Sequence, residues 1–90
     1  MSHIVYIIEC NNGSYYTGYT TDIDRRYQEH LKGSAKCKYT RAFPPKKLAA
    51  YWLFANRSDA LSAENIIKRK SKREKQQLVQ QWSTKQVGST

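Results

Sequence analysis

The feature that most restricts the fold is a pair of strand-like segments at the start of the chain, joined by a short turn. Residues 4–8 form a continuous apolar, largely β-branched run, which is typical of a strand covered on both faces and therefore central in its sheet. Residues 14–20 are rich in Tyr and Thr and predict a partner strand. The Asn-Asn-Gly of residues 11–13 predicts a hairpin turn between them. We therefore expect a small antiparallel sheet at the centre of the fold.

The length of this turn decides which side chains share a face, because side chains alternate along a strand. A two-residue turn would put Tyr6 and Tyr16 on opposite faces. A three-residue turn with Gly13 in the left-handed conformation pairs Tyr16 with Ile8 instead. The same register pairs Gly18 with Tyr6, so both tyrosines share a face. We predict the three-residue turn, with Gly18 leaving open space beside the Tyr6 ring where a substrate backbone could approach.

The rest of the chain predicts one more strand and three helices. Residues 21–24 (Thr-Asp-Ile-Asp) resemble a capping box and Gly33 is a natural C-terminal stop, which predicts a helix over 22–32. Its core stripe is Ile23, Tyr27 and Leu31. The remaining predicted elements are a loop over 34–47, a strand over 48–55, a helix over 59–70 and a short helix that docks through Leu78, Val79 and Trp82.

Length and composition limit the class of protein. A chain of 90 residues and 10.5 kDa has room for one domain, which we expect to span 1–82, with 83–90 as a disordered tail. No apolar run reaches the ~20 residues needed to span a bilayer, and no secretory signal opens the chain. We expect a cytoplasmic monomer without a membrane partner. Cys10 and Cys37 lack metal-ligand spacing, so we interpret them as packing or incidental thiols rather than zinc ligands.

The charge of the chain points to a polyanionic partner. Sixteen Lys and Arg against seven Asp and Glu give a net charge of +9, and thirteen of the basic residues fall between positions 32 and 75. Such an excess favours nucleic acid through counterion release, although solubility alone is the alternative explanation. The candidate contacts mix cations with an aromatic side chain that could stack on a base: Lys36, Lys38, Tyr39, Arg41, Lys68 and Lys72. A mobile loop and a solvated helical face are the alternatives for these segments.

Three polar residues stand at helix positions that face the predicted sheet. Arg26 and His30, four residues apart, lie on one flank of their helix stripe and can border the face that carries the tyrosines. Glu64 falls within the inward stripe of a later helix, where an unpaired carboxylate is costly. It could swing out to pair with Lys68, or hold a metal ion or an arginine at its tip.

Together these residues resemble the GIY-YIG nuclease superfamily, in its small, single-domain bacterial form. The first motif corresponds to residues 5–7 (Val-Tyr-Ile), the second to residues 16–18 (Tyr-Thr-Gly), the helical arginine and histidine to Arg26 and His30, and the glutamate to Glu64. The chain departs from the pattern where Val5 replaces a Gly, Ile7 falls at the Tyr of the name, and Thr17 replaces an Ile. The resemblance extends from residue 4 to about residue 80.

The resemblance implies an α+β fold, with a central three-stranded antiparallel sheet flanked by helices, and a DNA endonuclease that could serve repair or recombination. Tyr6 would act as general base or position water, Arg26 would stabilise the transition state, and Tyr16 and His30 would orient them. Glu64 would hold one Mg²⁺ or Mn²⁺. Because free tyrosine has a pKa near 10, a tyrosine base predicts activity that rises at mildly alkaline pH.

Two alternatives from other classes stay open. The chain could be a catalytically idle module that binds DNA or RNA through loop 34–47 and the basic segment 68–75. It could also be an adaptor for an acidic protein. The absence of a separate DNA-targeting domain leaves a structure-selective substrate, low intrinsic affinity, or recruitment by another protein as further possibilities.

Overall fold

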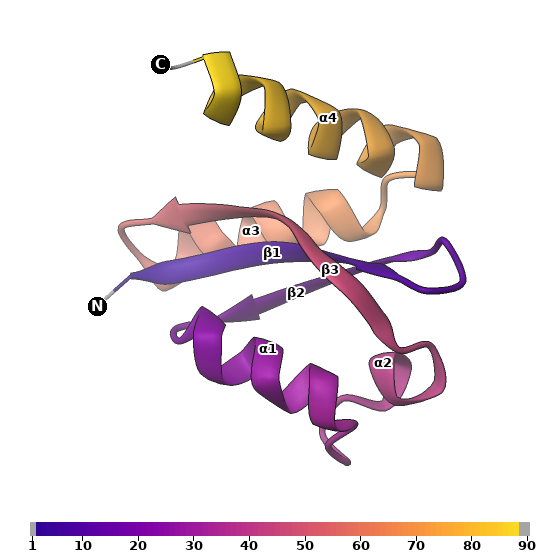
Figure 1. Cartoon of the computed structure of the whole chain (residues 1–90). Helices are drawn as coiled ribbons and strands as arrows, with labels where there is room; N and C mark the ends of the chain where they lie inside the picture. The colour runs from indigo at the N-terminus through magenta and orange to yellow at the C-terminus, as the bar shows by residue number, and fades with distance from the viewer. Residues whose placement is uncertain (1, 89–90) are drawn as a thin grey trace.

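The computed structural model describes residues 2–88 and has the expected α+β architecture (Figure 1). Its elements, in chain order, are β1 (His3–Cys10), β2 (Tyr15–Thr20), α1 (Ile23–Lys32), α2 (Lys38–Ala42), β3 (Pro45–Phe54), α3 (Arg57–Lys68) and α4 (Lys72–Gly88). The three strands form one antiparallel sheet in the order β2-β1-β3. The apolar strand β1 is therefore central, as its sequence predicts.

The hairpin has the predicted three-residue turn. Ile8 pairs with Tyr16 and Tyr6 pairs with Gly18. Gly13 has φ 86°, which favours glycine because side chains are strained in that region. The backbone amide of Cys10 donates to the Ser14 carbonyl at 2.8 Å and closes the turn. Both tyrosines consequently lie on one face of the sheet.

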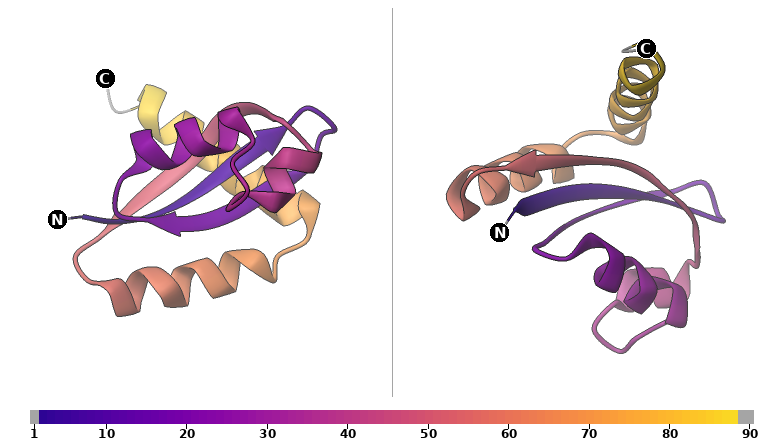
Figure 2. Two further views of the ribbon diagram at one scale, coloured as in Figure 1. Left: turned by 90° about the horizontal axis from the view of Figure 1, so that it is seen from below. Right: turned by 60° about the vertical axis from the view of Figure 1, so that its left-hand side comes forward.

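Helices cover both faces of the sheet, and each face has its own core. Tyr6, Ile8 and Cys10 face α1, where Ile23 and Tyr27 pack against them. Val5 and Ile7 face the other way, and the core on that side is completed by β3, α3 and α4 through Ala49, Ala50, Ala60, Ile67 and Val79. Figure 2 shows α1 against the sheet and α3 running beside β2, with which it is in contact.

The segment 34–47 differs from the predicted loop, because it contains helix α2 and the first residues of β3. Pro45 can open β3 because an edge strand does not need every backbone donor at its first residue. Thr40 on α2 is 1% exposed, so α2 is anchored in the fold rather than free in solvent. The basic and proline-rich composition of the segment concealed both elements.

Helix boundaries and helix faces also bring corrections. Asp22 caps α1 by accepting from the Arg25 amide at 3.1 Å, and Gly33 ends the helix in the left-handed conformation, as predicted. Leu31, however, is 48% exposed, and His30 at 2% takes its place in the interior. Helix α3 begins at Arg57 under an Asn56 cap, two residues earlier than predicted.

The last helix is longer than predicted. Ser71 and Glu74 form the reciprocal cap that opens α4, through bonds of 2.9 and 3.1 Å. The helix continues to Gly88, so residues 83–88 are helical rather than a disordered tail. The expected tail residues 89 and 90 lie outside the described part of the chain, and the domain boundary at residue 82 stays a prediction. Within residues 2–88, no helix is long and apolar enough to cross a bilayer.

Candidate active site

The centre of the candidate site is the buried side chain of Tyr6. It projects from β1 towards α1, is 1% exposed, and lies with its ring centroid 6.4 Å from that of Tyr16 and 5.7 Å from that of His30. Gly18 sits opposite on β2, where an added Cβ would lie 2.5 Å from Cζ of Tyr6 and 3.0 Å from Cε1. The space beside Gly18 is therefore filled by the Tyr6 ring itself. The prediction that a substrate backbone could use this space is wrong.

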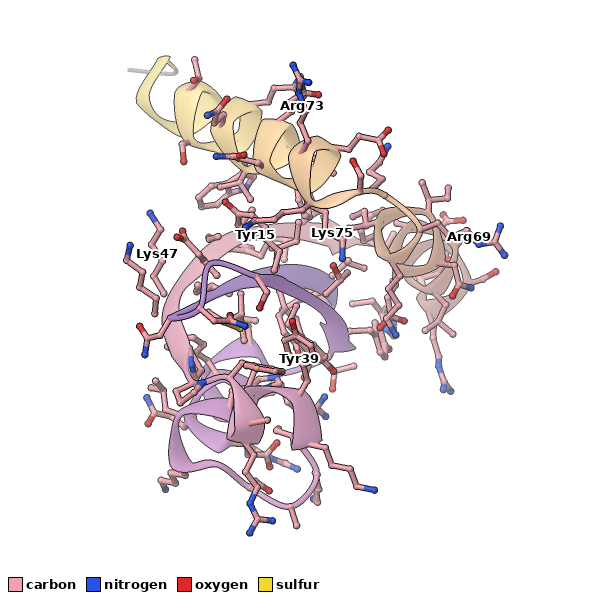
Figure 3. All side chains as sticks on the ribbon, turned by 90° about the vertical axis from the view of Figure 1, so that its right-hand side faces the viewer. Tyr15, Tyr39, Lys47, Arg69, Arg73 and Lys75 are labelled. Carbon is pink, nitrogen blue, oxygen red and sulfur yellow. The ribbon has the colours of Figure 1, made fainter. Side chains whose placement is uncertain are left out.

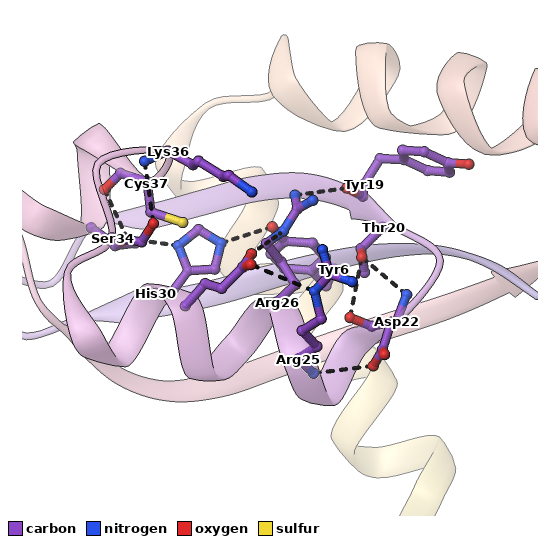
Figure 4. A network of polar contacts seen from close by, with 12 residues as sticks. Tyr6, Tyr19, Thr20, Asp22, Arg25, Arg26, His30, Ser34, Lys36 and Cys37 are labelled. Carbon is purple, nitrogen blue, oxygen red and sulfur yellow. Dashed lines mark hydrogen bonds and ion pairs between the residues drawn. The ribbon is translucent and has the colours of Figure 1, made fainter.

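A chain of hydrogen bonds starts at the Tyr6 hydroxyl (Figure 4). The Tyr6 oxygen lies 2.8 Å from His30 Nε2, and His30 Nδ1 lies 2.6 Å from Thr40 Oγ1. The Thr40 hydroxyl in turn donates to the Cys37 carbonyl at 3.3 Å. His30 comes from the last turn of α1 and Thr40 from α2, so the chain joins β1 to both helices on this face.

Burial sets the protonation states in this cluster. It lowers the pKa of His30, and the positive charge of Arg26 lowers that pKa further, so the imidazole is neutral at pH 7. Burial also raises the pKa of Tyr6 far above its ordinary value, and the neighbouring Tyr16 adds to the rise, although Arg26 opposes it. A freely formed Tyr6 phenolate is thus scarcer than in free tyrosine.

Arg26 lies at the border between this cluster and solvent. Its Nε donates to Glu29 Oε1 at 3.0 Å, and one terminal nitrogen donates to the Tyr19 carbonyl at 3.3 Å. These two bonds hold the guanidinium beside β2. The side chain is 37% exposed and borders a pocket of about 160 Å³. The pocket is lined by Tyr19, Thr20, Thr21, Asp22, Arg25 and Arg26.

A row of aromatic rings leads from the cluster to the surface. The Tyr39 ring stacks on the Tyr16 ring at 5.5 Å, and Phe43 lies 5.1 Å beyond Tyr39. Tyr39 is 37% exposed and Phe43 40% exposed. The predicted contact residues Lys36, Lys38 and Arg41 are exposed on and just before α2, beside this row.

The other predicted nucleic-acid contacts are on the opposite side of the sheet. Lys68 ends α3 and Lys72 begins α4, where the Lys72 ammonium approaches the hairpin turn. Figure 3 shows Arg69, Arg73 and Lys75 on this α3–α4 side, with Tyr39 on the α1–α2 side. The predicted nucleic-acid contacts therefore form two groups rather than one continuous track.

Glu64 stands apart from the Tyr6 cluster. Its side chain is 14% exposed and pairs with Lys68 Nζ at 3.2 Å, which is the pairing that the helix spacing allows. No hydrogen bond or ion pair among residues 2–88 joins Glu64 to Tyr6, Arg26 or His30. The described residues also contain no group of three or more His, Cys, Asp or Glu that could hold a metal ion.

The structure brings Tyr6, Tyr16, Arg26 and His30 together, as the sequence predicts, and adds Thr40 and Glu29. A signal for Thr40 follows only once His30 is known to be buried, because a buried histidine needs partners for both ring nitrogens. The signal for Glu29 is its i,i+3 spacing from Arg26, because side chains three residues apart are neighbours on a helix surface.

Comparison with known proteins defines the class. Residues 2–77 match the GIY-YIG catalytic domain. The chain belongs to the GIY-YIG family, which is of nuclease type, as a small single-domain member.

Its relatives are other small proteins. The chain is 49% identical to the UPF0213 protein BH0048 of Halalkalibacterium halodurans, over 88% of this chain and 83% of that protein. It is 48% identical to the UPF0213 protein HQ_3675A of Haloquadratum walsbyi, over 88% of each chain. The solution NMR structure of BH0048 from Bacillus halodurans superposes with a TM-score of 0.57, at 49% identity, covering 89% of this chain and 84% of that one.

Proposed function

We propose that this protein is a metal-dependent endonuclease that hydrolyses phosphodiester bonds in DNA. The observation that carries the proposal is the Tyr6–His30 hydrogen bond of 2.8 Å, with the Arg26 guanidinium at the rim of the same cluster. Membership of a nuclease-type family and a net charge of +9 support a nucleic-acid substrate.

A tyrosine with a raised pKa is a poor general base by itself, and His30 can compensate by accepting the Tyr6 proton. A buried Tyr6 loses its proton unfavourably, but it can take a proton from water while it passes its own proton to the neutral His30 Nε2. The water oxygen forms a bond to phosphorus, and the leaving oxygen departs with the electrons of the broken P–O bond. Arg26 stabilises negative charge on the phosphoryl oxygens. On this mechanism the acidic limb of the rate profile follows His30 protonation, and no alkaline rise from Tyr6 is required.

Nucleases of this family generally use a divalent metal ion, and Glu64 is the residue that would hold it. A largely buried carboxylate suits this role, because Mg²⁺ often binds through one or two carboxylates and keeps waters and substrate phosphates as its other ligands. When bound, Mg²⁺ or Mn²⁺ would supply positive charge at the leaving oxygen.

A catalytically idle nucleic-acid-binding module is the second candidate, and one observation favours it. Tyr6 is only 1% exposed, so its hydroxyl has little access to an attacking water. The exposed Tyr39 and Phe43 rings and the basic residues around α2 would serve binding without any cleavage.

Cleavage of end-labelled single-stranded and duplex DNA with Mg²⁺ or Mn²⁺ distinguishes the two candidates. We expect metal-dependent nicking that is lost in Glu64→Ala and falls about 10²–10³-fold in Arg26→Ala, the usual cost of removing a group that stabilises transition-state charge. Arg57→Ala makes the same change of charge at the exposed start of α3 and should cut normally. Equal low levels of cleavage in the native protein and all variants, or no cleavage in any of them, would favour the binding module.

A further inference from the structure

Thr40 carries a buried hydroxyl that the mechanism above leaves without a role. The residue is 1% exposed and lies in the middle of the five-residue helix α2. Its Oγ1 contacts two polar atoms, His30 Nδ1 at 2.6 Å and the Cys37 carbonyl oxygen at 3.3 Å. It therefore connects the imidazole to the backbone of the segment that precedes α2.

The chemistry of these groups fixes the direction of each hydrogen bond. A carbonyl oxygen only accepts, so the single hydroxyl proton of Thr40 goes to Cys37. The Thr40 oxygen then accepts from His30 Nδ1, which must carry a proton. In a neutral imidazole the other nitrogen, Nε2, is then unprotonated and accepts from the Tyr6 hydroxyl.

The reverse direction leaves a buried donor without a partner. If the Thr40 hydroxyl donated to Nδ1, Nε2 would carry the proton and donate to the Tyr6 oxygen. The Tyr6 hydroxyl proton would then have no acceptor among the hydrogen bonds of the described residues, and a buried donor without a partner is unfavourable. The first direction gives every proton in the chain an acceptor.

We infer that Thr40 is a positioning residue for hydrolysis, which holds His30 in the tautomer with Nδ1 protonated and Nε2 free to take the Tyr6 proton. The inference rests on the proposed function, since only a reaction that moves the Tyr6 proton needs this tautomer. With Nε2 already protonated, His30 could not receive that proton, and Tyr6 would have no base.

A purely structural role predicts a different behaviour. Threonine hydroxyls in helices commonly bond to a carbonyl three or four residues earlier, and the Thr40–Cys37 bond alone fits that habit. Such a threonine would stabilise α2 and leave the imidazole tautomer unchanged when it is replaced. The 2.6 Å contact with His30 Nδ1 is the feature that a structural role does not need.

The test reads the tautomer directly, by ¹⁵N NMR of the imidazole nitrogens at pH 7.5, with no metal or substrate. We expect Nδ1 to be the protonated nitrogen of His30 in the native protein. Thr40→Val is close in shape but lacks the hydroxyl, so it should raise the Nε2-protonated population several-fold, and Thr40→Ser should preserve the native pattern. A native protein with Nε2 protonated overturns the inference, as does a folded Thr40→Val with an unchanged tautomer. If Thr40→Val fails to fold, the native spectrum still tests the inference, because it shows which nitrogen of His30 carries the proton.

Cleavage assays separate this inference from the proposed function. In an active enzyme, Thr40→Val should lower the rate about 5–10-fold, the equivalent of one hydrogen bond of ~1 kcal/mol, and Thr40→Ser should restore it to within about 3-fold. A Thr40→Val rate equal to the native rate would overturn the inference. If the native protein cuts nothing, the proposed function fails, while the NMR result still shows whether Thr40 sets the tautomer.

Discussion

Replacing Gly18 by alanine tests the closest packing contact in the candidate site. The new Cβ would overlap the hydroxyl of Tyr6 and lie 2.5 Å from Cζ of the Tyr6 ring. Since Tyr6 is 1% exposed and bonded to His30, the ring has little room to withdraw. Only Gly13 and Gly33 have positive φ among the described residues, so the backbone at Gly18 would accept alanine without strain. The substitution therefore isolates side-chain packing.

The expected cost follows from three contributions. Overpacking a well-filled core costs about 1–3 kcal/mol. Disturbing the Tyr6–His30 hydrogen bond destabilises the fold by about 1 kcal/mol more. Alanine also lowers the entropy of the unfolded chain, which stabilises the fold by roughly 0.4–1 kcal/mol. We expect a net loss of about 2 kcal/mol in the free energy of unfolding, equivalent to a fall in Tm of ~8–16 °C in a domain of this size.

Guanidinium chloride unfolding of a double-mutant cycle would measure the contact. Tyr6→Leu removes the atoms that the new Cβ meets, so Gly18→Ala should cost at least about 1 kcal/mol less in that background. Gly13→Ala is the matched control: it is destabilised by its backbone φ of 86°, so its cost should not change with Tyr6→Leu. Gly18→Ala within about 0.5 kcal/mol of the native protein, or equal costs in both backgrounds, would refute the packing argument.

Two further predictions concern pH and binding. Folding lowers the pKa of His30, so the unfolded chain binds more protons below about pH 6.5, and stability should fall as the pH drops from there through the folded pKa. Unfolding midpoints at pH 7.5 and 5.5 should show this loss in the native protein and in His3→Gln, but not in His30→Gln; equal losses in all three would contradict it. Tyr39→Ala should weaken binding of a fluorescent oligonucleotide about 5–30-fold, as expected for one stacked base at ~1–2 kcal/mol, and Tyr39→Phe should bind normally. Equal affinities of the alanine and phenylalanine variants would show that the Tyr39 ring does not contact the oligonucleotide.

The features that sequence predicted well depend on local geometry. The turn length fixes the strand register, so a choice between two turns was enough to put Tyr6 and Tyr16 on one face. The caps at Asp22 and Ser71 likewise depend on residues only three positions away.

The features that sequence missed depend on contacts between distant segments. The sequence predicts Leu31 in the core stripe of α1, but the buried residue is His30, whose imidazole has a partner on each nitrogen, Tyr6 on β1 and Thr40 on α2. Helix α2 is too short to show a hydrophobic period, and its anchor, Thr40, is a polar residue. The register correctly predicts the pairing of Gly18 with Tyr6, but not that the Tyr6 ring fills the space beside Gly18 while its hydroxyl bonds to His30.

The ion pair of Glu64 with Lys68 is weak enough to be exchanged for a metal ion. A carboxylate in an inward helix stripe needs a positive partner, and Lys68 supplies one at 3.2 Å. The Lys68 side chain is 51% exposed, however, and an exposed ammonium contributes only about 0–1 kcal/mol to such a pair. A divalent ion that arrives with a substrate phosphate could displace it at small cost. The Glu64–Lys68 pair is therefore no argument against metal binding, and Lys68→Met, which removes the competing charge, should leave metal-dependent cleavage intact if Glu64 holds the ion.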